Sequence, residues 1–371
     1  MKILITYVSA GTGHRRAAEA IYNYFKANCQ QLDLEIIDEL EKTNFIFKNI
    51  YSNGYLFLVN HALWLWRFLF WLSSLSPLRS VTRIANDLVN RINSRKFIAF
   101  IVGKKPDIVI STHFLPSEIV CYLKKTKAIN SKLITVITDY GIHPFWIING
   151  TDMYAVASDF TKGLLALKGV ADKNIIDSGI PVDPKFFEKY DKVVLAKKFA
   201  IDPDKFTVLI STGSSGIGDI EEVIGQLYKD VQILVVCANN RILYAKLSKY
   251  GYPGVRVFGF IENIQELMSV ADMIITKPGG LTIAESLAMG LSPVFITAIP
   301  GQETENVKIL AANQIGVRVK KSSAVKDTVL YFRNNPAELK NARDKINKFK
   351  RPFAVKELCN VVCQGSVGAS C

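Results

Sequence analysis

A glycine pair behind an apolar run is the segment of this sequence whose chemistry is easiest to state. Residues 274–276 predict a buried strand, Gly279 and Gly280 follow, and a short helical pattern then carries an acidic residue, Glu285. Such a junction presents free backbone N–H groups and the positive end of a helix dipole, which favour an anionic ligand. A carboxylate repels phosphate but accepts hydrogen bonds from sugar hydroxyls. The segment therefore suggests a nucleotide-sugar site, although many α/β proteins have such a turn for packing alone.

Histidines supply the candidates for proton transfer. His14 ends a glycine-rich loop, residues 9–14, at the predicted start of a helix. An imidazole with a pKa near 6.5 can accept a proton from a hydroxyl at neutral pH, although a capping or loop histidine would have the same setting. Asp139 and His113 follow strand patterns; Asp139 could orient a histidine, act as a base, or cap the next turn. All four histidines lie in the first half of the chain, so an acceptor deprotonated by histidine would bind there.

Polar and aromatic residues follow two further strand patterns in the second half. Gln302, Glu303 and Asn306 come after the predicted strand 293–296, and their side chains could form a hydrogen-bonding set for a polyhydroxylated ring. A plain surface turn would have the same composition. Gly259, Phe260 and Ile261 follow another predicted strand. Their backbone groups and the Phe260 ring could face a nucleotide base.

Strands and helices alternate along both halves of the chain. The predicted strands are 2–8, 35–37, 108–111, 133–138 and 153–157, then 207–211, 232–237, 255–258, 273–276 and 293–296. The predicted helices include 15–26, 97–104, 117–127 and 220–227. This alternation implies parallel sheets covered by helices on both faces. We expect an α/β chain of two doubly wound, Rossmann-like domains facing each other across a cleft, with ligands at the carboxyl ends of the strands.

Length and composition agree with this organisation. The 371 residues exceed one ordinary core, and a hydrophobic content of 49% with a mean hydropathy of +0.18 excludes a disordered chain. Prolines and charges gather between residues 179 and 205, which places the predicted domains at 1–185 and 186–350. Residues 351–371 are predicted to form a helix and a tail, and the helix could pack back on the first domain. The six cysteines show no metal-ligand spacing, so no metal site is expected.

An insertion at residues 44–101 does not fit a doubly wound sheet, because it is far longer than an ordinary connection. Its centre, 55–72, is mostly apolar and meets the lower length limit for a membrane span, but polar residues inside it argue against spanning. Trp64, Arg67 and Trp71 share one helical stripe, as at a lipid headgroup boundary. The membrane-facing candidates are Trp64, Trp66, Arg67, Trp71, Arg79 and Arg83.

The insertion and the net charge of +13 together favour a peripheral protein on an anionic membrane surface. A helical hairpin buried between the domains and a true membrane span are the alternatives. Nucleic acid is disfavoured as the acidic partner, because the sequence has neither C2H2 spacing nor an RNP-type motif.

In this order, these segments resemble the GT-B glycosyltransferase superfamily, and specifically the diacylglycerol glycosyltransferases of the monogalactosyldiacylglycerol synthase type. The N-acetylglucosaminyltransferase that makes lipid II belongs to the same clan. The match covers nearly the whole chain outside the insertion. The segments that carry it are 9–14, 138–146, 179–184, 276–290 and 300–306.

The resemblance implies a UDP-sugar donor, UDP-glucose or UDP-galactose, in the second domain. Glu285 would bind the ribose hydroxyls and residues 259–261 would face uracil. Gln302, Glu303 and Asn306 would contact the transferred sugar. The residues around the diphosphate would be Gly213, Ser214, Gly216, Lys277, Gly279, Gly280, Leu281 and Thr282.

The resemblance also implies inversion at the anomeric carbon without a metal or other cofactor, because backbone donors stabilise the diphosphate charge. His14 would be the base, with Asp139 as a second catalytic residue, and diacylglycerol would be the acceptor. The acceptor would be contacted by Gly11, Thr12, Gly13, His113, His143 and Trp146. The implied function is glycolipid synthesis at the cytoplasmic face of the cell membrane. Transfer of N-acetylglucosamine to a polyprenyl-diphosphate-linked acceptor, and a non-enzymatic lipid-binding relative, stay open as alternatives.

Overall fold

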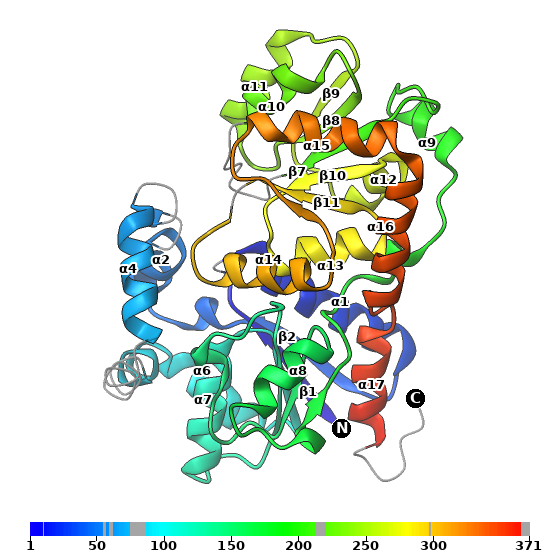
Figure 1. Cartoon of the computed structure of the whole chain (residues 1–371). Helices are drawn as coiled ribbons and strands as arrows, with labels where there is room; N and C mark the ends of the chain where they lie inside the picture. Colours follow the sequence, from blue (N-terminus) through cyan, green and yellow to red (C-terminus); the bar gives the residue numbers. More distant parts are fainter. Residues whose placement is uncertain are drawn as a thin grey trace. The chain divides into compact units, whose positions relative to one another are not determined.

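The computed structural model describes residues 1–9, 11–54, 57–58, 62–74, 87–211, 220–296 and 298–364, without the side chains of 52, 53 and 69–74. The chain forms two compact units (Figure 1). The N-terminal unit comprises residues 1–183, 299–305 and those from 351 onward, and the C-terminal unit comprises 184–298 and 306–350. The short segment 299–305 therefore belongs to the N-terminal unit although it lies in the second half of the sequence.

A parallel sheet of six strands forms the centre of the N-terminal unit, in the order β2-β1-β3-β4-β5-β6. Its strands are β1 (Lys2–Tyr7), β2 (Asp33–Asp38), β3 (Ile108–Ser111), β4 (Lys132–Val136), β5 (Met153–Ala155) and β6 (Ile175–Ile176). The helices around it are α1 (Thr12–Asn28), α6 (Arg95–Lys104), α7 (Phe114–Lys125), α8 (Asp159–Ala166) and α17 (Ala354–Gln364). Short 3-10 turns lie at Glu39–Lys42, Pro144–Trp146 and Asp172–Asn174.

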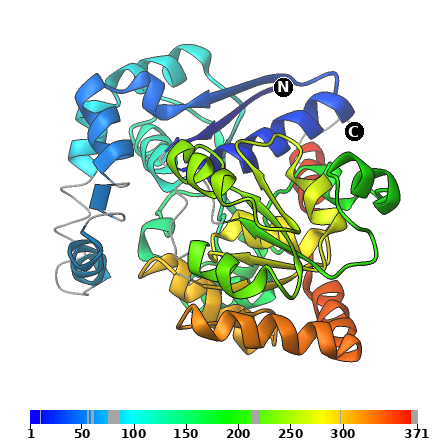
Figure 2. The same cartoon turned by 90° about the horizontal axis from the view of Figure 1, so that it is seen from above.

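Alternation along β1 explains why both faces of this sheet are covered. Ile3 and Ile5 join a core with α1 and α17, whereas Leu4 joins a separate core with α6 and α7. Successive residues of a strand face opposite ways, so one apolar strand serves two cores. Helix α1 lies along β1 and β2 in both views (Figures 1 and 2). The C-terminal helix α17 packs against α1 in the first of these cores.

The insertion contributes further helices to the N-terminal unit. They are α2 (Phe45–Asn49), a π-helical turn (Ile50–Gly54), α4 (Leu63–Ser74) and a helical stretch at residues 87–93. The backbone N–H of Asn44 donates to the Asn93 carbonyl oxygen at 3.3 Å, which joins the two ends of the insertion. Next to this closure, the Ser94 hydroxyl donates to the buried Glu39 carboxyl group at 2.9 Å.

A second six-stranded parallel sheet forms the C-terminal unit, in the order β12-β11-β10-β7-β8-β9. Its strands are β7 (Thr207–Ser211), β8 (Gln232–Val236), β9 (Val255–Phe258), β10 (Met273–Thr276), β11 (Ser292–Phe295) and β12 (Val317–Arg318). The helices of this half are α9 (Lys192–Lys198), α10 (Ile220–Leu227), α11 (Arg241–Tyr250), α12 (Ile264–Val270), α13 (Gly280–Ala288), α14 (Gln302–Ala312), α15 (Ser323–Asn334) and α16 (Pro336–Phe349), with a 3-10 turn at Pro184–Phe187.

The prediction of a doubly wound α/β fold in both halves is confirmed. Four predicted strands have the predicted ends, namely 108–111, 207–211, 255–258 and 273–276. The predicted strand 133–138 is too long, because β4 ends at Val136 and leaves Thr138 and Asp139 in the loop behind it. The predicted helix 117–127 begins earlier, at Phe114, where the His113 side chain caps it.

Candidate active site

His14 lies in the first turn of α1, where the ends of two strands hold its ring. Its Nδ1 atom is 2.7 Å from the Thr112 carbonyl oxygen and 2.9 Å from the Thr138 hydroxyl oxygen. A carbonyl oxygen only accepts hydrogen bonds, so the hydrogen of the His14 ring is on Nδ1 and the lone pair is on Nε2. This orientation leaves Nε2 as the ring atom that can accept a proton.

Strand order explains why these residues meet. The chain runs from β1 to β2 on one side of β1, and then returns to β3 on the other side, which makes a topological switch point between β1 and β3. His14 follows β1, Thr112 follows β3, and Thr138 follows β4. Ligands of doubly wound sheets bind at this point, beyond the carboxyl ends of the strands.

Burial and charge act on His14 in opposite directions. Burial lowers the pKa of His14 below its ordinary value, while the negative charge of Asp139 and the hydrogen bond to Thr112 oppose this shift. His14 is therefore neutral at pH 7, the state that a general base needs. Asp139 is half-buried and near enough to influence His14 through its charge.

His113 is a buried neutral neighbour of His14. Its ring stands edge-on to the His14 ring with 4.7 Å between centroids, and its side chain is only 4% exposed. Burial first, and then the nearby His14, hold the pKa of His113 well below its ordinary value. Its Nδ1 accepts the Leu115 N–H at 3.1 Å and caps α7, so the ring hydrogen is on Nε2. His113 thus caps α7 and also carries a neutral ring N–H beside His14.

Aromatic side chains complete this group. The Trp146 ring is buried, with its centroid 6.1 Å from that of His14 and 6.2 Å from that of His113. Its indole N–H makes no hydrogen bond within the described residues. His143 caps the short turn that ends at Trp146, because its Nδ1 accepts the Phe145 N–H at 3.3 Å. His143 therefore helps to place Trp146, whose buried ring packs near His14 and His113.

The remaining predicted acceptor residues are at the start of α1. Gly11 and Thr12 are exposed and Gly13 is half-buried. The structure therefore brings His14, His113 and Trp146 together, with Asp139 nearby. Sequence reasoning assigned no role to Thr112 and Thr138 as partners of His14. The available signal was that each is a polar residue close behind a buried strand.

The glycine turn of the C-terminal unit lies at the switch point of the second sheet. β7 and β10 are neighbours there, and the Thr276 hydroxyl donates to the Ser211 carbonyl oxygen at 2.6 Å where both strands end. Helix α13 begins at Gly280; Gly279 at the cap position provides no side-chain cap, and the first turn has no acidic residue. An uncapped helix N-terminus of this kind suits an anion.

Other predicted donor residues surround this turn. Lys277 and Thr282 are half-buried, Leu281 is buried in the core, and Glu285 is 4% exposed on α13. Because the Leu281 side chain is buried, this residue could contact a ligand only through its backbone. Phe260 is 61% exposed behind β9, between the half-buried residues Gly259 and Ile261. Gly213, Ser214 and Gly216 lie outside the described residues.

The residues predicted to contact the transferred sugar divide between the two units. Asn306 is fully buried in the C-terminal unit, and its amide nitrogen donates to the Pro278 carbonyl oxygen at 3.0 Å. Asn306 thus fixes the glycine turn. Gln302 and Glu303 belong to the N-terminal unit, where Glu303 Oε2 accepts the Ile299 N–H at 2.7 Å. Glu303 therefore also shapes its own loop.

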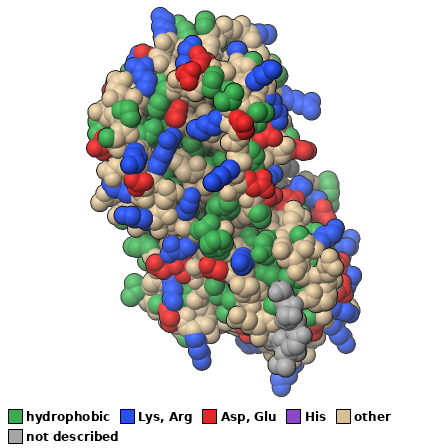
Figure 3. All heavy atoms as spheres, turned by 90° about the vertical axis from the view of Figure 1, so that its right-hand side faces the viewer, with side chains coloured by type: hydrophobic (Ala, Val, Ile, Leu, Met, Phe, Trp, Pro, Cys, Tyr) green, Lys and Arg blue, Asp and Glu red, His purple; other side chains and the backbone are tan. Residues whose placement is uncertain are grey.

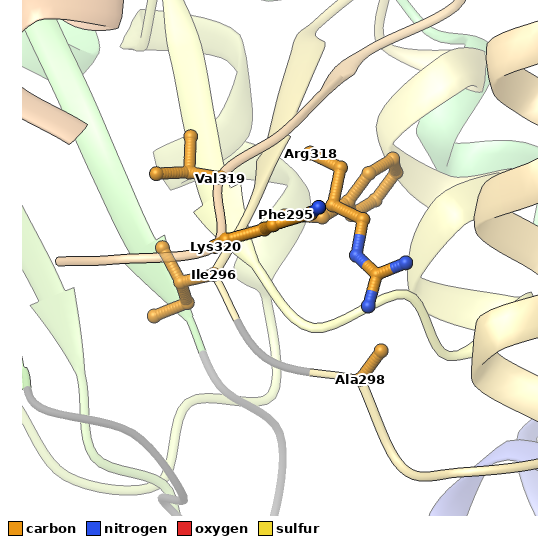
Figure 4. Close-up of a pocket in the computed structure, with 6 residues that line it drawn as sticks. All are labelled: Phe295, Ile296, Ala298, Arg318, Val319 and Lys320. Carbon is orange, nitrogen blue, oxygen red and sulfur yellow. The ribbon is translucent and has the colours of Figure 1, made fainter. Parts of the chain in front are cut away.

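A small pocket of about 110 Å³ opens at the carboxyl ends of β11 and β12. Figure 4 shows the Arg318 side chain pointing toward Ala298 across this pocket. It is lined by Phe295, Ile296, Ala298, Arg318, Val319 and Lys320. The pocket and the glycine turn therefore both lie beyond the carboxyl ends of strands of the same sheet.

The insertion exposes many apolar side chains. On α4, Trp64 is 74% and Phe68 50% exposed, and Arg67 is exposed too, whereas Trp66 is partly buried. Further exposed apolar residues, which sequence reasoning did not single out, are Phe45, Ile46, Ile50, Phe57, Leu88, Val89 and Ile92. The side chain of Trp71, and residues Arg79 and Arg83, lie outside the described part. We call the exposed apolar residues of α2, α4 and 87–93 the insertion patch.

Among the described helices, none combines the length and the apolar character that crossing a membrane requires. The face drawn in Figure 3 carries Lys and Arg side chains interspersed with acidic and apolar ones, without a continuous basic stripe.

The sulfur atoms of the buried Cys29, Cys359 and Cys363 lie within 4.8 Å of one another; Cys29 and Cys359 are reduced thiols, whereas Cys363 is disulfide-bonded. Cys29 is at the far end of α1 from His14, roughly 22 Å away at 1.5 Å per residue. This cluster is therefore separate from the candidate active site.

Comparison with known proteins identifies relatives of both halves. The family described as monogalactosyldiacylglycerol (MGDG) synthase matches residues 14–182, and the glycosyltransferase family 28 C-terminal domain matches residues 207–358. A processive diacylglycerol beta-glucosyltransferase of Bacillus licheniformis is 30% identical over 96% of this chain and 91% of its own length.

Solved structures with a similar fold include MurG of Acinetobacter baumannii, with a TM-score of 0.61 and 14% identity over 98% of this chain and 99% of that one. HepE of Anabaena in complex with UDP-glucose has a TM-score of 0.57 and 13% identity over 98% and 99% of the two chains. Identity this low shows the fold alone, which is the predicted GT-B fold.

Proposed function

This chain belongs to the glycosyltransferase family of monogalactosyldiacylglycerol synthases and processive diacylglycerol glucosyltransferases, and we propose that it transfers glucose from UDP-glucose to diacylglycerol. The observation that carries the proposal is the ring of His14, whose Nδ1 is bound to the Thr112 carbonyl oxygen so that Nε2 is left to accept a proton. The name of the Bacillus licheniformis relative supports glucose over galactose.

In the proposed reaction, His14 Nε2 removes the proton of the free glycerol hydroxyl as its oxygen attacks the anomeric carbon of the sugar. The bond from that carbon to the diphosphate breaks on the opposite face, so that the configuration inverts and UDP leaves. Backbone N–H groups at the start of α13, with Lys277 beside them, would stabilise the negative charge on the leaving diphosphate. This mechanism uses no metal. Glu285 would bind the ribose and residues 259–261 the uracil.

The acceptor side of the proposal rests on apolar surface. Trp146 and Phe114 provide apolar rings beside His14 and His113, which suits the glycerol end of a lipid. The insertion patch would lie in the plane of the membrane interface, with basic side chains near anionic headgroups. Exposure of Trp64 and Phe68 disfavours the alternative of a hairpin buried in the protein. We place the protein at the cytoplasmic face of the cell membrane.

The test is a donor panel with purified protein and vesicles that contain diacylglycerol. UDP release and product mass would be measured with UDP-glucose, UDP-galactose and UDP-N-acetylglucosamine. We expect hexosyl-diacylglycerol, formed fastest from UDP-glucose. Faster product formation from UDP-galactose would overturn the sugar assignment. Product formed only with a polyprenyl-diphosphate-linked acceptor would overturn the lipid assignment, and vesicle binding without UDP release would indicate a non-enzymatic relative.

A further inference from the structure

One tryptophan of the insertion is turned toward the protein while its neighbour is exposed. On α4, Trp64 is 74% exposed, but the indole N–H of Trp66 donates to the Pro300 carbonyl oxygen at 3.2 Å. The two bonded residues are 234 positions apart in the sequence, and both belong to the N-terminal unit. This hydrogen bond joins the helix of the insertion patch to the segment 299–305, which includes Gln302 and Glu303 in the first turn of α14.

The segment 299–305, which we call the loop although residues 302–305 form the first turn of α14, is held in one shape by its own hydrogen bonds. The Ile299 N–H donates to Glu303 Oε2 at 2.7 Å, and the Gly301 N–H donates to the Thr304 hydroxyl at 3.1 Å. The Glu305 N–H in turn donates to the Gly301 carbonyl oxygen at 3.1 Å. A loop tied in this way transmits a displacement of Pro300 to its neighbours, because few of its torsions are left to absorb it.

A second contact supports the loop from the acceptor side. A Cβ atom added to Gly141 would lie 2.6 Å from Glu305 Cβ, so the backbone at Gly141 is in close contact with the Glu305 side chain. Gly141 is two residues beyond Asp139, in the segment behind β4. The loop is therefore supported at Pro300 by the insertion and at Glu305 by the segment that carries the candidate catalytic residues.

We propose that Trp66 is a positioning residue that couples the binding of α4 to a lipid surface to the geometry of Gln302 and Glu303. The exposed side of α4, with Trp64, would face the lipid, while Trp66 holds the loop from the other side of the helix. The assignment of sugar recognition to Gln302 and Glu303 rests on the proposed function; the mechanical link between α4 and the loop does not. Membrane binding would then order the sugar-recognition loop at the place where the lipid acceptor is found.

The first test measures the link without catalysis. Amide hydrogen exchange of residues 299–305 would be followed with and without anionic vesicles at saturating lipid, in wild type, Trp66→Phe and Trp64→Phe. Phe keeps the ring but lacks the N–H. We expect vesicles to slow exchange in the loop at least about threefold in wild type and in Trp64→Phe, and to have no such effect in Trp66→Phe, since one hydrogen bond contributes a factor of this size. The proposal is overturned if vesicles do not slow amide exchange in the wild-type loop. It is also overturned if vesicles slow exchange in Trp66→Phe as much as in wild type.

The second test measures donor use at saturating vesicles. We expect Trp66→Phe to raise the KM for UDP-glucose about three- to tenfold while vesicle affinity stays within about twofold of wild type. An unchanged KM contradicts the link to sugar recognition. If wild type transfers no hexose at all, the proposed function fails, and the exchange experiment still decides the link. If wild type transfers hexose but Trp66→Phe shows normal loop protection, the link fails alone.

Discussion

The orientation of the His14 ring is the decisive feature at the scale of single residues. In a serine protease triad, a carboxylate holds the ring of the histidine; here the Thr112 carbonyl oxygen, with the Thr138 hydroxyl beside it, contacts Nδ1. Burial lowers the pKa of His14, and the charge of Asp139 and the hydrogen bond to Thr112 oppose this shift. The base form of His14 is then present at and above neutral pH, and it is lost as the pH falls through the lowered pKa.

The charge of Asp139 gives a prediction about pH dependence. Asp139 raises the pKa of His14 against the effect of burial, so Asp139→Asn removes an opposing influence and the pKa of His14 falls further. We expect the acid limb of kcat/KM to lie below pH 6.5 in wild type and to shift to lower pH in Asp139→Asn. Asp33→Asn, which changes an exposed carboxylate of the same unit, should leave the limb in place. If the acid limb of kcat/KM stays in place or moves to higher pH in Asp139→Asn, Asp139 does not raise the pKa of His14.

At the scale of structural elements, Glu39 forms a buried contact next to the point where the two ends of the insertion meet. It is fully buried behind β2, and the Ser94 hydroxyl donates to it. Burial, reinforced by the charges of Glu118 and Asp38 and opposed by the Ser94 hydrogen bond, raises the pKa of Glu39 to about 8. The ordinary pKa of a glutamic acid is 4.5. Between about pH 4.5 and about pH 8, Glu39 is therefore protonated in the folded protein but ionised in the unfolded chain.

A proton held more tightly by the folded state makes stability fall as pH rises through that window. We expect the free energy of unfolding of wild type, measured by urea denaturation, to decrease between pH 5 and pH 8 owing to Glu39. Glu39→Gln keeps a neutral side chain at every pH, so its stability should decline less over the same range. An equal decline in both proteins would mean that Glu39 is ionised in the folded state.

Gly179 links two elements of the N-terminal unit by close contact. Its φ is +96°, and an added Cβ would lie 2.4 Å from Arg351 Cβ. Arg351 in turn donates to Asp177 at 2.8 Å and to Asp159 at 3.0 Å. We expect Gly179→Ala to lower the free energy of unfolding by about 2 kcal/mol or more, from backbone strain and overlap together.

The matched control is Gly163→Ala in α8, where an added Cβ meets nothing within 4 Å. Because alanine is a better helix former than glycine, this change should be neutral or stabilising by about 0.5–1 kcal/mol. Equal effects of the two substitutions in urea denaturation would show that the contact with Arg351 is unimportant.

At the scale of the whole molecule, net charge and the insertion patch together should determine membrane binding. With a net charge of +13, the protein should bind anionic vesicles more tightly than neutral ones, and the difference should shrink as salt increases. The exposed Trp64 ring gives a second prediction about membrane binding. Trp64→Ala should weaken binding to both kinds of vesicle about tenfold, because the exposed ring no longer enters the interface. Ile242, 84% exposed on α11, gives the control Ile242→Ala, which should bind as wild type does in vesicle sedimentation. Equal losses in the two variants would remove the patch from the binding surface.

The sequence predicted the fold better than it predicted the site. Apolar, β-branched runs such as 108–111 and 207–211 predict the central strands well, because buried parallel strands leave a continuous apolar signature. The edge strands β6 and β12 have two residues each and leave no such pattern. Helix α2 was missed for a related reason, since five residues are too few to show a helical period.

The candidate site shows a similar limit. Histidine chemistry identified His14, but its partners Thr112 and Thr138 come from different strands, and only the strand order brings them to one ring. Likewise Asn306 bonds to the Pro278 carbonyl oxygen and Trp66 to that of Pro300, contacts that depend on tertiary folding. Residue type indicates which groups can do chemistry, whereas partners and tautomers require the structure.

The most direct test of the proposed reaction is the rate and anomeric configuration of the glycolipid formed from UDP-glucose, followed by NMR for wild type and His14→Gln. A base that activates the acceptor for a single in-line displacement predicts a β-linked product from the α-linked donor, and a rate at least about a hundredfold lower in His14→Gln. An α-linked product, or a His14→Gln enzyme as fast as wild type, would contradict the mechanism.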